Sequence, residues 1–293
     1  MGDKLKAVLE RVKRNRIVAR ALQVNSRYGA DGGGYLSASL AYYGFLSLFP
    51  LILVALSGIG FILAHDPRAQ AEWASRLAAS VPGIGALIGK NIAAVVDKRA
   101  GAGILGVVGL LWSGTALTNA GGYSLSRVYR RPEAQGMIKQ KVWSVSSTIG
   151  LGLVALAGIG VAGTVAGVHA RSWVGPVVGV ATVVVAYALD VLLFLVSYRV
   201  LTAGWGPSFS KLWPGSLLAA AGWTVLKVAG AWYASRTVAH ASQVYGTFGT
   251  VVGALAILYL AARLFLYGAE LNVVLMGGGR PSKKKGEQLQ QAA

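Results

Sequence analysis

The sequence contains no cysteine and few charged residues, and both shortages restrict what the protein can be. Without cysteine, the chain forms no disulfide, no thiolate nucleophile and no cysteine-ligated metal site. Only 13% of its 293 residues are charged, against about 25% in an ordinary soluble domain. Because 55% of the residues are hydrophobic, the polar residues are too few to cover a water-soluble globule of this size. The composition therefore predicts a protein that lies largely in lipid.

Acidic residues are the scarcest charged type, with ten in the whole chain. No pair of acids or histidines stands at a metal-ligand spacing such as HxxxH or DxD. A metal-dependent nuclease needs such clusters to hold cations against phosphate. The sequence therefore predicts no metal, no cofactor and no enzymatic site.

Long runs with few or no charges are abundant, and each is long enough to cross a bilayer, which takes about 20 helical residues. Backbone groups in lipid must pair internally, so each run is predicted to be an α-helix. The fold class is an all-α, polytopic membrane bundle of six transmembrane helices. Residues 1–34 form an amphipathic lead, residues 35–276 the transmembrane domain and residues 277–293 a disordered tail. The predicted spans are about 35–64, 100–122, 143–168, 174–198, 212–235 and 248–275.

Basic residues set the orientation of the chain, which carries a formal net charge of +18. With the N-terminus inside, the inside segments hold 19 Lys and Arg and the outside segments hold seven. This asymmetry predicts that both termini are cytoplasmic. The basic excess then meets anionic lipid heads, and nucleic acid is not an expected partner. Residues 4–24 suit a helix that lies in the membrane interface, and a solvated helix packed on the bundle is the alternative.

Four stretches resemble a known family. "ASLAYYGFLSLFPLILVALSGIG" (38–60) is similar to the first-helix signature of the YihY/BrkB family of bacterial inner-membrane proteins. "YGTFGTVVGALAILYLAARLFLYGAELNVVL" (245–275) resembles its last helix, and "LWPGSLLAAAGWTVLKVAGAWYAS" (212–235) its fifth. "LSRVYRRPE" (125–133) is a looser match to its basic loop. The resemblance implies six transmembrane helices in the inner membrane. Some members carry a ribonuclease or virulence label, and translocation of lipids has also been suggested for the family.

Charges inside the predicted spans are the main functional pointer: Asp190, Lys227, Arg263 and Glu270. Each costs about 2.5–3.5 kcal/mol at mid-membrane on insertion scales, so each needs a partner or water. At about 1.5 Å per residue, Asp190 lies about 12 Å and Arg263 about 18 Å above the inner ends of their helices. The flexible arginine side chain spans this difference, so the two are predicted to pair. Glu270 is expected below them, within reach of cytoplasmic water, and Lys227 above them. The set forms either a polar path for an amphiphile head or a buried ion pair that fixes helix register.

Proline and glycine mark bends and close contacts. Pro50 is predicted to kink the first span. Gly58 and Gly60 in the first span, and Gly249 and Gly253 in the last, are predicted to let helices approach closely.

The histidines His65, His169 and His240 all fall at the outer face in this topology. They would bind zinc only if they converged, and loops simply tolerate polar residues. The favoured function is non-enzymatic transport or translocation of a lipid-like or other amphiphilic substrate. The alternative is a scaffolding envelope protein without flux, and a ribonuclease is the least favoured. Expected partners are membrane lipids, with a homo-oligomer or envelope proteins as further candidates.

Overall fold

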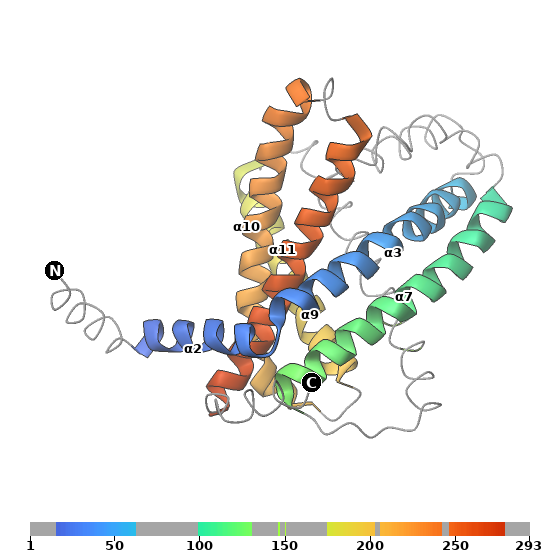
Figure 1. The fold of residues 1–293 in the computed structure, drawn as a ribbon. Helices are drawn as coiled ribbons and strands as arrows, with labels where there is room; N and C mark the ends of the chain where they lie inside the picture. Colours follow the sequence, from blue (N-terminus) through green and yellow to red (C-terminus); the bar gives the residue numbers. More distant parts are fainter. Residues whose placement is uncertain are drawn as a thin grey trace.

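The computed structural model describes residues 16–62, 99–130, 146, 150, 175–202, 206–241 and 246–278. All six elements in these ranges are helices, which agrees with the predicted all-α class. Figure 1 shows α10 and α11 side by side, α3 and α7 running together at an angle to them, and α2 lying across one end of the bundle. The helices are α2 (Arg16–Ala30), α3 (Gly33–Ile62), α7 (Arg99–Tyr129), α9 (Gly175–Leu201), α10 (Phe209–Ala241) and α11 (Gly246–Leu275).

Four of these helices are long and apolar enough to cross a membrane. Their apolar windows are Gly33–Val54, Gly103–Tyr129, Val183–Leu201 and Val251–Leu275, and they correspond to four of the six predicted spans. The predicted span 212–235 lies within α10, which is 33 residues long but is not among the four. Apart from Ser146 and Gly150, the predicted span 143–168 lies outside the described residues. Six crossings and two cytoplasmic termini therefore stay predictions.

Glycines on α7 let it pack closely on α3. A Cβ added at Gly106 would stand 3.0 Å from Leu53, and one at Gly109 would stand 3.1 Å from Pro50. Such distances leave little room for a larger side chain, so this row of small residues sets the separation of the two helices. The row continues at Gly103, which faces Ser57.

The structure tests only part of what we predict for Pro50 and for the glycines of the first and last spans. Pro50 lies inside α3, which continues as a helix through it, and the predicted kink stays a prediction. Gly253 is exposed and no described atom lies within 4 Å of the position a Cβ would take. The close helix contact predicted there is therefore absent among the described residues. Gly58, Gly60 and Gly249 lie in α3 and α11, but their surroundings are outside what the structure describes.

Helices α10 and α11 approach each other closely at Gly215 and Gly268. A Cβ at Gly268 would collide with the Tyr198 hydroxyl and the carbonyl oxygen of Gly215. Next to this contact, the Gly215 amide donates a hydrogen bond to Asn272 Oδ1 at 2.7 Å. The Asn272 side chain is fully buried. Its carboxamide packs at this contact and accepts the hydrogen bond of a buried backbone N–H.

The buried core lies at the end of the bundle where α3 and α10 begin and α7, α9 and α11 end (Figure 1). Large side chains from all of these helices and from α2 meet there, whereas much of the remaining helix surface is apolar and exposed. Exposed apolar side chains are what a helix presents to lipid. The core comprises Tyr28, Leu36, Leu40, Leu125, Val128, Leu195, Tyr198, Leu212, Ala262, Leu266, Ala269 and Val273.

A two-residue turn places α2 across this core. Gly32 has φ of +73°, a left-handed conformation that glycine adopts without steric cost. Gly33 follows directly, and a Cβ there would collide with the Tyr28 ring. Because α3 begins at once after this turn, the last turns of α2 are held against α11, where Val24, Arg27 and Tyr28 are buried.

Candidate functional site

An ion pair between α2 and α11 lies at the centre of the core. Arg27 Nε donates to Glu270 Oε2 at 2.8 Å, and the two side chains are only 2% and 1% exposed. Arg27 Nη2 also donates to the Val128 carbonyl at 3.3 Å, which ties the pair to α7. Water is excluded from this pair, so it fixes α2, α7 and α11 relative to one another.

A second layer of charge surrounds the pair. Asp31 Oδ2 lies 3.8 Å from Arg27 Nη2, and Asp31 Oδ1 lies 3.7 Å from Arg130 Nη2. Arg130 is 45% exposed, so the charges lead from the buried pair to the surface. The four side chains carry two positive and two negative formal charges. We call Arg27, Asp31, Arg130 and Glu270 the charged node.

The structure corrects the prediction for Glu270. We expected this carboxylate to be within reach of cytoplasmic water, but it is buried and paired with Arg27. The sequence carries no direct signal for Arg27 as the partner, because it stands 243 positions away in the amphipathic lead. The run Asp31-Gly32-Gly33-Gly34 is the one local signal for the turn that brings α2 onto α11.

The predicted pair of Asp190 with Arg263 is wrong. Asp190 Oδ2 instead lies 2.6 Å from Lys227 Nζ, and this pair joins α9 to α10. The Lys227 side chain is 41% exposed and that of Asp190 is 14% exposed. Unlike the charged node, this pair stands on the outer surface of apolar helices.

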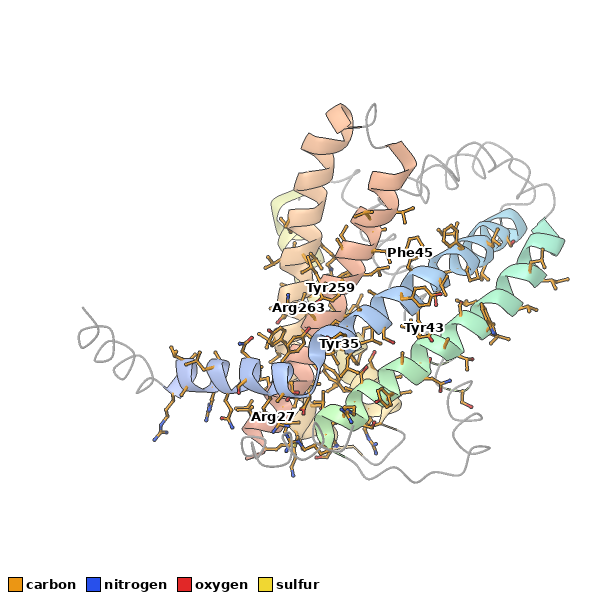
Figure 2. The ribbon with its side chains drawn as sticks, viewed as in Figure 1. Arg27, Tyr35, Tyr43, Phe45, Tyr259 and Arg263 are labelled. Atoms are coloured by element: carbon orange, nitrogen blue, oxygen red, sulfur yellow. The ribbon has the colours of Figure 1, made fainter. Side chains whose placement is uncertain are left out.

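Arg263 lies among aromatic rings. Its Cζ atom is 5.9 Å from the Tyr259 ring centroid, 5.7 Å from that of Tyr267 and 5.5 Å from that of Tyr28. Figure 2 shows Arg263 and Tyr259 on the same stretch of α11, close to the start of α3, where Tyr35 lies. Arg263 is half-buried, and no carboxylate among the described residues lies within ion-pairing distance of it.

Helix α2 completes this aromatic site. The Tyr28 ring stacks on Tyr267 with centroids 4.4 Å apart, and its hydroxyl lies 3.0 Å from Ser37 Oγ. Burial raises the pKa of the Tyr28 hydroxyl, so the phenol stays neutral. Tyr267 Oη donates to Asn25 Oδ1 at 2.8 Å, and Arg263 Nη2 donates to Tyr267 Oη at 3.4 Å. We call Tyr28, Tyr259, Arg263 and Tyr267 the tyrosine cage.

The four predicted site residues therefore fall into three separate places. Glu270 belongs to the charged node, Asp190 and Lys227 form a surface pair, and Arg263 fills the tyrosine cage. Among the described residues, no group of three or more His, Asp or Glu side chains stands together as metal ligands would. His65 and His169 lie outside the described residues, and only the backbone of His240 is described, so their convergence stays untested.

Comparison with known proteins places the chain in a family. It is 26% identical over 285 residues to the inner membrane protein YhjD of Escherichia coli, which covers 89% of this chain and 82% of the relative. It is 26% identical over 259 residues to the putative ribonuclease-like protein YfkH of Bacillus subtilis, and the match covers 85% of this chain and 92% of the relative. A Dickeya dadantii protein is 27% identical over 283 residues, with 89% and 84% covered. No solved structure matches. The model of the family described as virulence factor BrkB matches residues 24–291, and the chain belongs to this family of membrane proteins.

Proposed function

We propose that this protein transports or translocates a lipid-like or other amphiphilic substrate in the bacterial inner membrane. One observation carries the proposal: Arg263 lies within the apolar window Val251–Leu275, half-buried and without a described carboxylate partner. An inner membrane location is supported by the relationship to YhjD, which is named an inner membrane protein.

The contrast with the charged node supports a role in function for Arg263. The pair that holds α2 against α11 is inaccessible: Arg27 and Glu270 are almost fully buried and hydrogen-bonded to each other. Arg263 is half-buried among tyrosine rings and has no described carboxylate partner, although a charge inside a membrane span is costly. Ionisable residues kept inside membrane spans at such a cost often mark substrate or ion pathways.

The ion pair of Lys227 with Asp190 is a second polar site on the bundle. Lys227 and Asp190 join α10 to α9, and the Lys227 side chain is 41% exposed. Asp190 lies inside the apolar window Val183–Leu201, and ionisable residues within membrane spans often mark substrate pathways. We therefore assign this pair to the path of a polar head group along the bundle.

Flux through purified protein tests the proposal. The full chain is reconstituted into liposomes that contain a fluorescent phospholipid, and transfer between leaflets is followed by quenching from outside. We expect faster transfer than in empty liposomes, and slower transfer with Arg263→Gln. Arg199→Gln is the matched control, because Arg199 also lies over an aromatic ring, 5.8 Å from the Phe209 centroid. Equal rates for wild type and Arg263→Gln would refute the site.

The alternative, a scaffolding envelope protein, predicts no transfer above empty liposomes. The ribonuclease reading draws on the name of the relative YfkH and predicts metal-dependent cleavage of RNA. Acidic side chains would have to hold that metal, and the described residues offer no cluster of this kind. We propose no catalytic role and no cofactor. Homo-oligomers or envelope protein partners remain expectations of the scaffold reading.

A further inference from the structure

We infer that the tyrosine cage is a binding site for the phosphate-bearing head of an anionic membrane lipid. The inference rests on the proposed function, because it names the chemical class of the substrate at the same arginine. It draws on four features: the geometry of the cage, its charge, its unused hydrogen-bond donors and its position beside α2.

The geometry follows from helical spacing. Tyr259, Arg263 and Tyr267 are four residues apart, so they share one face of α11. Their rings and that of Tyr28 surround the guanidinium at 5.5 to 5.9 Å. Aromatic rings in such a cage recognise cations. Here the protein supplies the cation itself, so the cage holds Arg263 in place and is not a site for a choline-like head.

The charge of the cage calls for an anion. Lys227 is neutralised by Asp190, and Arg27 by Glu270. Three cations inside the four apolar windows have no described carboxylate partner: Arg127, Arg199 and Arg263. Arg127 and Arg199 stand in the last turn of their helices, whereas Arg263 lies well inside its window. The neutral phenols around it do not cancel its charge. An anionic ligand would gain from this charge, and a neutral ligand would not.

The guanidinium also has donors to spare. It carries five N–H groups, and its one hydrogen bond to a described residue goes to Tyr267 Oη at 3.4 Å. Phosphate oxygens match the forked geometry of arginine and accept two parallel hydrogen bonds. The Tyr259 hydroxyl, which lies 3.8 Å from the Cβ position of Gly34, is a further donor at the start of α3.

The position of the cage favours a lipid over a soluble anion. The first half of α2 exposes Arg16 and Arg20 together with Ile17 and Leu22, the composition of a helix in the membrane interface. Tyr28 of this helix stacks on Tyr267, so the interface lies near Tyr267. Arg263 is one turn further along α11, about 6 Å deeper. That level corresponds to the head groups and the first acyl carbons, and the neighbouring Tyr35 is 88% exposed.

Direct binding tests the inference without any flux measurement. The full chain, delipidated in detergent, is titrated with short-chain phosphatidylglycerol, with phosphatidylcholine and with inorganic phosphate, and bound molecules are counted by native mass spectrometry. Phosphatidylglycerol should bind most tightly. Loss of charge-assisted hydrogen bonds should weaken its binding to Arg263→Gln by roughly 10- to 100-fold. Arg263→Lys keeps the charge but not the fork, so it should lose less. Arg199→Gln should bind as wild type does.

Three outcomes would overturn the inference: unchanged phosphatidylglycerol binding in Arg263→Gln, an equal loss in Arg199→Gln, or inorganic phosphate binding as tightly as the lipid. If Arg263→Gln does not fold, the comparison of Arg263→Lys with wild type decides, because unchanged binding by the lysine variant contradicts the forked contact. A protein that binds phosphatidylglycerol through Arg263 but gives no lipid transfer would refute the proposed function and leave this inference standing.

Discussion

Removing one partner of the buried pair should destabilise the protein severely, and removing both should not. Arg27→Met leaves Glu270 buried without its 2.8 Å hydrogen bond, and Glu270→Met leaves the Arg27 charge buried. Breaking a buried pair by removing one partner costs about 3–5 kcal/mol. Asp31 lies 3.8 Å from Arg27 and offsets part of the loss in Glu270→Met, so we expect about 3 kcal/mol there and more for Arg27→Met.

The double variant separates charge from packing. Replacing a buried pair by apolar side chains of similar volume is often neutral or even stabilising. Asp31 keeps Arg130 as a neighbour at 3.7 Å, so no charge is stranded when both partners are gone. We therefore expect Arg27→Met with Glu270→Met to be more stable than either single variant.

Unfolding in mixed micelles of mild detergent and sodium dodecyl sulfate, followed by circular dichroism, gives the free energies for this double-mutant cycle. Arg20→Met is the control, since Arg20 is exposed on the same helix and should change stability by less than about 0.5 kcal/mol. Single-variant costs below about 1 kcal/mol, or costs that simply add in the double variant, would refute the reasoning.

Two further predictions concern packing and exposed charge. Gly268→Ala should lower the free energy of unfolding by about 1–3 kcal/mol, since its Cβ meets Tyr198 and backbone. Gly253→Ala in the same helix meets nothing and should be neutral or up to about 1 kcal/mol stabilising, so equal losses in thermal stability would contradict the contact. Lys227→Met should lower the free energy of unfolding by about 1–3 kcal/mol, because it leaves Asp190 without its partner inside the apolar window Val183–Leu201; no measurable loss would contradict this reasoning.

Helix positions could be predicted because lipid imposes a simple rule on sequence. The predicted spans 35–64 and 248–275 differ from α3 and α11 by two residues or fewer at each end. The predicted span 100–122 ends too early, since α7 continues to Tyr129. Its last turns are more polar, but Leu125 and Val128 are buried in the core at that end. Packing against other helices therefore extends α7 beyond the apolar run.

The partners of the charges could not be predicted in the same way. Depth along a helix was the criterion for pairing Asp190 with Arg263, but depth does not give the rotation of a helix about its axis. It also assumes that all helices end in one plane. Depth also leaves out the reach of long side chains: Lys227, placed well above Asp190 by that criterion, still contacts it at 2.6 Å. The pair of Arg27 and Glu270 depends on the docking of α2, which no periodicity of residues 248–275 reveals.

The charged node and the tyrosine cage are linked through α2. Arg27 and Tyr28 are adjacent in sequence, and both reach α11, one at Glu270 and the other at Tyr267. Because Gly32 turns the chain directly into α3, α2 has little freedom to shift unless these contacts break. The buried pair therefore holds one wall of the cage in place. This explains why a chain with only ten acidic residues buries one of them at this position. Through Arg27, the buried carboxylate of Glu270 positions the Tyr28 ring, and this ring contacts the half-buried guanidinium of Arg263.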